Sequence, residues 1–296
     1  MKLSEAFSIF LHEVRARKRS DSTFKNYDYL FRDWTRYANK HGLTDLNSFT
    51  QDEIRLWRDS WTTRTSTTKL RLTLLRTFFR FAVKEGWIDH FPMSNVLNPK
   101  VVSNPTLPFN RDEMLSLVVA AEDHIQEKAL ILLMRYAGLS IQDAVTCSRN
   151  HINGDTLILR RAKTGELVIA YLPDPVIESL RSITLNRSPY FFWSGESKPA
   201  TATKFWRQRL KAVARKAGVA DFKPHRLRDT FAVELLSNDV SIEDVSTLLG
   251  HSSINTTERH YAPWNKARRN RLIQITQNAN LNDPLLQKLS KRSQKN

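Results

Sequence analysis

The C-terminal third of this 296-residue chain contains the segment Pro224-His225-Arg226-Leu227-Arg228-Asp229-Thr230-Phe231-Ala232. His225 and Arg228 are three positions apart, so a helix would place the imidazole and the guanidinium side by side on one face. Leu227, Phe231 and Leu235 fall on another face, which predicts that the helix packs into a core. We therefore expect a buried helix over about 225–237 that presents two cationic or hydrogen-bonding side chains.

Two further groups of polar residues flank this helix in the sequence. Downstream, a capped helix begins at Ser241 and ends near Gly250; His251 follows at once and Tyr261 comes ten residues later. Upstream, the β-rich runs 156–159 and 167–171 enclose Lys163-Thr164-Gly165-Glu166, a predicted hairpin turn. Each residue alone has an ordinary explanation as a cap, a packed aromatic ring or a solvated charge.

The combination of two histidines, an arginine, a lysine and a tyrosine, without a carboxylate cluster for a metal, suits metal-free phosphodiester chemistry. Arginine and histidine can neutralise the charge that gathers on the nonbridging oxygens of a phosphorane-like transition state. A tyrosine hydroxyl can act as the nucleophile. A lysine on a hairpin can protonate the leaving oxygen.

The remaining sequence predicts a mainly α fold with a small β-hairpin (α+β) in two domains. Helical spacing of apolar residues runs through 1–95, with helices over about 22–38, 52–61 and 67–85 and no strand signals, which predicts a small helical bundle. The proline-containing stretch 96–108 lacks periodicity and is the predicted linker. A second domain is expected over 109–276, opening with Asn110 as a helix cap and continuing with helices near 127–138, 202–217 and 242–249.

Charge points to a polyanionic partner. The chain has 46 Lys and Arg residues against 30 Asp and Glu, a formal charge of +16. The excess is spread along the chain, with 18 basic against 11 acidic residues in the first 100 positions and 28 against 19 in the rest. A distributed excess of positive charge favours nucleic acid as the partner over a small acidic metabolite.

The single cysteine, Cys147, excludes an internal disulfide framework. The absence of a long apolar run argues against a membrane partner.

Taken together, the segments 225–232, 248–257 (Leu-Leu-Gly-His-Ser-Ser-Ile-Asn-Thr-Thr) and Tyr261 resemble the signature of phage-integrase-like tyrosine recombinases. The N-terminal part is similar to that family's helical, SAM-like core-binding domain. The resemblance implies a site-specific DNA recombinase or integrase that cuts and rejoins DNA through a 3'-phosphotyrosyl intermediate. Tyr261 would be the nucleophile, Arg228, His225 and His251 would act on the scissile phosphate, and Lys163 would be the general acid.

The same resemblance implies how the protein works in the cell. It implies no metal or other cofactor, double-stranded DNA with specific recombination sites as the partner, and a monomer or dimer in solution that forms a homotetramer on DNA. The two domains would clamp the duplex. A cytoplasmic, nucleoid-associated location in a prokaryote, or an origin in a phage or other mobile element, is implied as well.

This sequence departs from the family pattern at two points. The family's first catalytic arginine follows a Gly-Leu pair, but here Gly138-Leu139 is followed by Ser140. An inactivating substitution, a slow enzyme and a different arrangement of the site would all be consistent with Ser140, and Arg135 is the nearest arginine upstream. The second departure is the ten-residue spacing from His251 to Tyr261, one longer than the usual spacing, which a loop would have to absorb.

Candidate DNA contacts are less specific, because basic residues are also common as solvated surface charges. The candidates are Arg17, Lys18, Arg19, Arg64, Lys69, Arg71, Arg207, Arg209 and Lys211. The tail 277–296 combines a leucine stripe with basic residues and is expected either to be exchanged between subunits or to be a frayed terminus.

A recombinase-derived DNA-binding protein with impaired catalysis is the main alternative function, and a type IB-like topoisomerase is a more distant one.

Overall fold

The computed structural model describes residues 1–17, 20–101, 107–184, 188–261, 264, 273–278 and 280. The chain divides into two compact units, Met1–Ser103 and Asn104–Asn296. The division falls within the stretch 96–108 that the sequence predicts as a linker. The tail 277–296 lies almost entirely outside the described residues.

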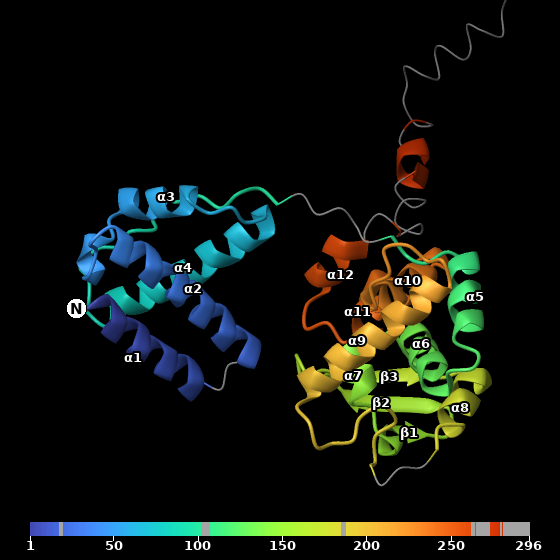
Figure 1. Ribbon diagram of the computed structural model, residues 1–296. Coiled ribbons are helices and arrows are strands. Elements are labelled where there is room, and N and C mark those ends of the chain that lie inside the picture. Colours follow the sequence, from blue (N-terminus) through green and yellow to red (C-terminus); the bar gives the residue numbers. More distant parts are fainter. Residues whose placement is uncertain are drawn as a thin grey trace, which may run out of the picture. The chain divides into compact units, whose positions relative to one another are not determined.

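The first unit is a bundle of four α-helices (Figure 1). These are α1 (Leu3–Ala16), α2 (Asp21–Lys40), α3 (Gln51–Asp59) and α4 (Thr65–Lys84), with a short 3-10 turn η1 (Leu46–Ser48) before α3. Ser20 and Thr50 cap α2 and α3 by accepting hydrogen bonds from the backbone N–H groups of Thr23 and Glu53. Aromatic rings fill the core, where Phe7 stacks on Phe31 with ring centroids 4.0 Å apart and Trp34 is fully buried.

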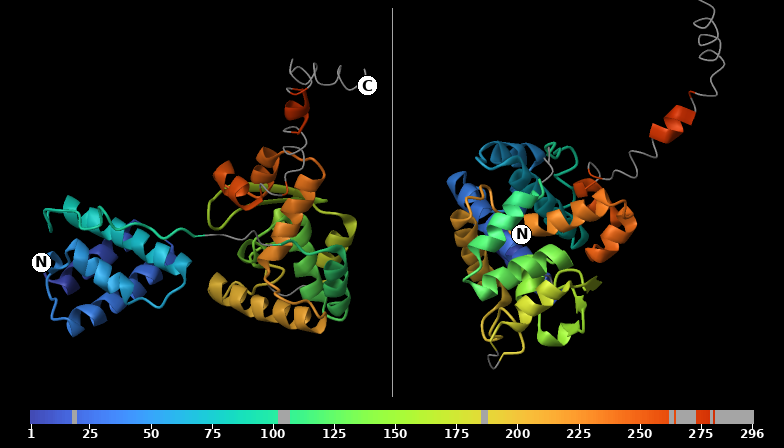
Figure 2. Two further views of the ribbon diagram at one scale, coloured as in Figure 1. Left: turned by 90° about the horizontal axis from the view of Figure 1, so that it is seen from above. Right: turned by 90° about the vertical axis from the view of Figure 1, so that its right-hand side faces the viewer.

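In the second unit, helices pack on one face of a small sheet that lies at the edge of the unit (Figures 1 and 2). Its helices are α5 (Arg111–Ala120), α6 (Ile125–Ala137), α7 (Ile141–Val145), α8 (Asp174–Arg181), α9 (Pro199–Lys216), α10 (His225–Ser237), α11 (Ile242–Leu248) and α12 (Ile254–Tyr261). The 3-10 turn η2 (Arg149–His151) leads into the strands β1 (Ile152–Asn153), β2 (Thr156–Arg160) and β3 (Leu167–Tyr171). The sheet is antiparallel in the order β1-β2-β3, and Ile158 pairs with Ile169 in the hairpin.

Helix α6 is the centre of the second unit and contacts α5, α7, α8, α9, α10 and β3. This position explains its dense apolar sequence, because residues such as Leu130, Leu133 and Met134 have no exposed surface. Helix α6 ends at Gly138, which adopts a left-handed conformation with φ of 60°. The chain therefore turns sharply at Gly138 and brings Ser140 to the start of α7.

The mainly α fold with a small β-hairpin is confirmed. The Asn110 cap and the hairpin around Lys163 form where the sequence predicts them, and the Glu113 side chain completes a capping box with Asn110. Helix α8, the five-residue α7 and the two-residue β1 were not predicted, because short elements carry too few periodic residues to be recognised. No helix among the described residues is long and apolar enough to cross a bilayer.

Candidate active site

Arg228 is the most constrained side chain of the candidate site. Helix α10 buries it to 2% exposure, and its guanidinium donates to the carbonyl oxygens of Gly138 at 2.6 Å and Leu249 at 2.9 Å. These carbonyls belong to the ends of α6 and α11, which have no intrahelical donors of their own. Burial, followed by the positive charge of Arg161, lowers the pKa of Arg228 to about 10. Arg228 makes no ion pair with any residue that the structure describes.

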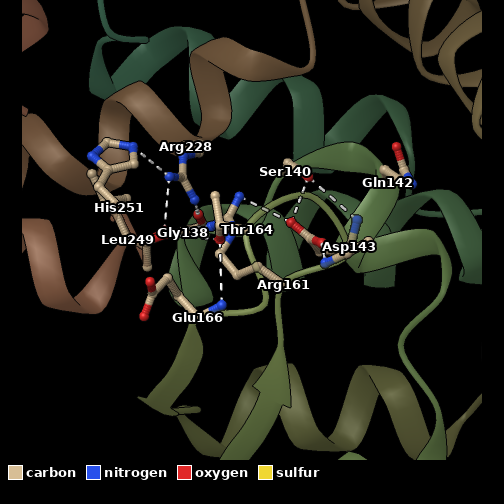
Figure 3. Close-up of polar contacts among 12 residues, drawn as sticks. Gly138, Ser140, Gln142, Asp143, Arg161, Thr164, Glu166, Arg228, Leu249 and His251 are labelled. Carbon is tan, nitrogen blue, oxygen red and sulfur yellow. Dashed lines mark hydrogen bonds and ion pairs between the residues drawn. The ribbon is translucent and has the colours of Figure 1, made fainter. Parts of the chain in front are cut away.

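His251 lies beside Arg228, three residues before α12 begins (Figure 3). Its Nε2 is 2.8 Å from a guanidinium nitrogen of Arg228, and its Nδ1 is 2.7 Å from the hydroxyl of Thr257. Because a guanidinium can only donate, Nε2 must accept and the proton must sit on Nδ1. Burial and then the charge of Arg228 lower the pKa of His251 to about 4, so the imidazole is neutral at pH 7.

Tyr261 ends α12 and is 3% exposed. Its hydroxyl donates to Oδ1 of Asp229 at 2.6 Å, while Oδ2 of Asp229 is buried and has no hydrogen-bond partner among the described residues. Burial, followed by the negative charge of Asp229, raises the pKa of Tyr261 well above its usual range. His225, one turn before Asp229 on α10, places Nε2 3.5 Å from the same carboxylate oxygen.

One cavity of about 460 Å³ brings these groups together. Its walls include the five residues to which the sequence analysis gives catalytic roles, together with Ser140 at the position of the family's first arginine; the five are Lys163, His225, Arg228, His251 and Tyr261. Lys163 reaches it from the exposed turn between β2 and β3. The ten-residue spacing between His251 and Tyr261 is compatible with this arrangement, because residues 251–253 are not helical and α12 starts only at Ile254.

Ser140 caps α7 and binds Asp143, which lies on the same short helix. The Ser140 hydroxyl is 2.6 Å from Oδ2 of Asp143 and accepts a hydrogen bond from the Asp143 backbone N–H. Oδ1 of Asp143 accepts from the backbone N–H of Ala162 at 2.9 Å, which ties α7 to the hairpin. Arg135, the upstream arginine, pairs instead with Glu234 of α10 and does not line the cavity.

Arg161 is the residue that the sequence analysis missed. It follows β2, is 8% exposed and forms an ion pair of 2.9 Å with Oδ2 of Asp143 (Figure 3). A signal was present, because Leu157 and Leu159 of β2 are buried in alternation and Arg161 occupies the next inward position. A charged residue at an inward position indicates a buried partner.

The predicted DNA contacts differ in their surroundings. Arg17, Arg71 and Arg209 pair with Glu13, Asp33 and Glu127, respectively. Four exposed candidates form no ion pair within the described ranges: Arg64, Lys69, Arg207 and Lys211. Lys18 and Arg19 lie outside those ranges.

The described residues contain no group of three or more His, Cys, Asp or Glu side chains suited to a metal ion.

Comparison with known proteins agrees with this geometry. The model of the phage integrase family matches residues 109–268, and that of the phage integrase N-terminal SAM-like domain matches residues 7–86. The chain belongs to the phage integrase family. Its second unit therefore carries the catalytic domain of a tyrosine recombinase, an enzyme that transfers DNA strands, and its first unit carries the SAM-like domain.

Individual members of the phage integrase family resemble the chain along most of its length. A tyrosine recombinase of Thermosipho africanus is 28% identical over 265 residues, which cover 86% of this chain and 93% of the relative. A crystal structure of a lambda integrase dimer bound to a core site has a TM-score of 0.70 at 20% identity and covers 86% of this chain and 97% of that one. A lambda integrase tetramer bound to a Holliday junction has a TM-score of 0.68 at 20% identity, with 86% and 78% covered.

Proposed function

We propose that this protein is a site-specific recombinase that cuts and rejoins double-stranded DNA through Tyr261. The convergence of Tyr261, Arg228, His225, His251 and Lys163 on one cavity is the observation that carries the proposal. These side chains come from α10, α12, the hairpin turn and the segment after α11. They lie close together only because the second unit folds. Packing alone does not require four cationic or basic groups around a buried tyrosine.

In the proposed reaction the Tyr261 oxygen attacks the scissile phosphorus. A phosphorus–oxygen bond to tyrosine forms, the bond from phosphorus to the 5' oxygen breaks, and Lys163 protonates that leaving oxygen. The tyrosine proton has an acceptor nearby, because the hydroxyl already donates to Asp229. In the second step a 5' hydroxyl attacks the phosphotyrosine, returns its proton to Lys163 and releases Tyr261.

Arg228 and His225 would stabilise the charge on the nonbridging oxygens, and His251 would act on the phosphate indirectly, by holding the guanidinium of Arg228 through Nε2. The guanidinium of Arg228 is held by two carbonyls and one imidazole, so its position is set before DNA arrives. Donors that are already oriented avoid the cost of reorganisation during the reaction. His225 is the exposed member of the set and can approach the phosphate from solvent.

The assembly on DNA is also part of the proposal. Both units carry exposed cations without a described ion pair, Arg64 and Lys69 in the first and Arg207 and Lys211 in the second. We expect the two units to clamp a duplex and four copies to assemble on paired sites; a lambda integrase tetramer bound to a Holliday junction, which shares the fold, supports the expected number of copies. The setting would be prokaryotic cytoplasm, where the recombinase acts for the host or for a phage or other mobile element.

A DNA-binding protein with impaired catalysis is a second candidate, because Ser140 replaces an arginine and Tyr261 is buried against Asp229. One experiment separates the two functions. Bound sites are first selected from fragmented genomic DNA and sequenced. A duplex of a recovered site, nicked beside the cleavage position so that the cut end diffuses away, is then tested for a covalent adduct on a denaturing gel.

We expect the unaltered protein to form this adduct and Tyr261→Phe to form none while binding the same duplex with nearly unchanged affinity. The missing hydroxyl is needed for attack and not for docking. DNA binding without any adduct from the unaltered protein would favour the non-catalytic alternative. An adduct that persists in Tyr261→Phe would show that another residue is the nucleophile.

A further inference from the structure

The cavity holds two buried guanidinium groups, although the sequence lacks an arginine at position 140. Arg161 reaches the cavity from the end of β2, and Arg228 reaches it from α10. Both donate to one acceptor, the carbonyl oxygen of Leu249, so they lie side by side (Figure 3). Two neighbouring guanidinium groups in one cavity can both donate hydrogen bonds to the same anion.

Only one of the two guanidinium groups forms a direct ion pair with a carboxylate of the described residues. Asp143 is the only carboxylate in the described chain that forms an ion pair with either guanidinium, and it pairs with Arg161. Arg228 donates to two carbonyls and to a neutral imidazole instead. Arg228 therefore lacks a direct ion pair, although the nearby carboxylates of Asp143 and Asp229 attract it from a longer distance, and an anion entering the cavity could accept hydrogen bonds from both guanidinium groups.

We propose that Arg161 is a catalytic residue that contacts a nonbridging oxygen of the scissile phosphate and replaces the guanidinium missing at Ser140. This inference rests on the proposed strand cleavage through Tyr261. Asp143 positions Arg161 through their ion pair and through its hydrogen bond to the next residue, Ala162. Arg161 breaks and forms no covalent bond; its N–H groups stabilise charge on phosphorus-bound oxygens as the pentacoordinate state forms.

The contacts of Ser140 explain how Arg161 can replace the family's arginine that is missing at position 140. Ser140 and Arg161 both contact Oδ2 of Asp143, so the same carboxylate can orient a guanidinium that comes from either backbone position. A serine at 140 is small enough to leave this space to Arg161 and still caps α7. Arg135 cannot take the role, because it is paired with Glu234 outside the cavity.

The decisive experiment measures the rate of adduct formation on the nicked duplex of the selected site. We expect Arg161→Gln to reduce this rate by about 10²–10³-fold, the usual effect of removing one donor to such a transition state. DNA affinity should change little. Arg160→Gln is the matched control, because it removes the same charge from the adjacent, exposed residue. Within the described part of the chain, the Arg160 side chain hydrogen-bonds only to the Gly165 carbonyl, so this change should leave the rate unchanged.

Two further measurements distinguish catalysis from a structural role. In the double variant Ser140→Arg with Arg161→Gln, an arginine again reaches Asp143, and we expect at least a tenfold recovery of the rate over Arg161→Gln. A duplex with a neutral methylphosphonate at the scissile position lacks the charge that Arg161 would neutralise. The loss caused by Arg161→Gln should be at least tenfold smaller on this substrate than on the phosphate.

Three results would overturn the inference while the unaltered protein still forms its adduct. They are an unchanged rate in Arg161→Gln, an equal loss on phosphate and methylphosphonate, and no recovery in a double variant that is folded by circular dichroism. Absence of adduct from the unaltered protein would instead contradict the proposed recombinase function, and this inference with it. The two failures are therefore distinguishable.

Discussion

The contact between Arg228 and His251 sets the protonation state of the imidazole. Arg228 donates to Nε2, so His251 carries its proton on Nδ1. The Nδ1–H group donates a hydrogen bond to the hydroxyl of Thr257, which is fully buried. A second proton on Nε2 would face a guanidinium at 2.8 Å. This repulsion adds to the effect of burial, and both favour the neutral ring.

We expect His251 to titrate near pH 4, far below a histidine in the unfolded chain. The unfolded state then takes up the proton first, so the contribution of His251 to stability falls as the pH decreases from about 6.5 toward 4. The loss of stability grows through this range and levels off once the folded state is protonated as well. The carbon resonance of the His251 imidazole, assigned through His251→Gln, measures the midpoint directly. A midpoint near 6.5 would show that Arg228 does not hold the ring neutral.

At the scale of elements, the β2–β3 hairpin and the end of α11 form one tightly packed contact. Gly250 follows α11 with φ of 61°, and a Cβ atom there would lie 2.4 Å from Cδ of Arg161 and 2.8 Å from Cγ2 of Val168. Thr164 in the hairpin turn also donates to the Gly250 carbonyl at 3.4 Å. Position 250 therefore requires glycine for two reasons: its positive φ, and the Arg161 side chain that fills the space where a Cβ atom would lie.

We expect Gly250→Ala to destabilise the protein more than Gly154→Ala does. Both positions have a positive φ, 61° and 64°, but a Cβ at Gly154 would meet nothing within 4 Å. The two variants share the conformational penalty of about 1 kcal/mol, and only Gly250→Ala adds overpacking of about 1–3 kcal/mol. Thermal unfolding followed by circular dichroism compares them. Equal midpoints would mean that Arg161 moves aside at no cost.

How much of the site can be read from sequence depends on whether its contacts follow from local spacing. His225 and Arg228 share a helical face, and the order of His251, Tyr261 and Lys163 forms a recognisable pattern. The pairing of Arg161 with Asp143 is different, because it joins the end of a strand to a five-residue helix that has no periodic signature. Alternation along β2 indicates only that Arg161 points inward and does not identify its partner.

At the scale of the whole molecule, the formal charge of +16 predicts binding that depends steeply on salt. If the two units together contact about six to ten phosphates, affinity for the selected duplex should fall by about 10³–10⁵ between about 50 and 200 mM salt, because each contact releases condensed counterions. Fluorescence anisotropy across a salt series gives the slope. A flat profile would contradict a clamp made by both units.

The carboxylate of Asp143 has a consequence for how related chains should be sorted into active and inactive. It binds both Ser140 and Arg161, so the proposal for Arg161 implies that a guanidinium beside this carboxylate can come from position 140 or from the inward position after β2. A test that inspects only the residue after Gly138-Leu139 would class this chain as catalytically dead. A reliable criterion asks instead whether an acid at the position of Asp143 has an arginine within reach from either element.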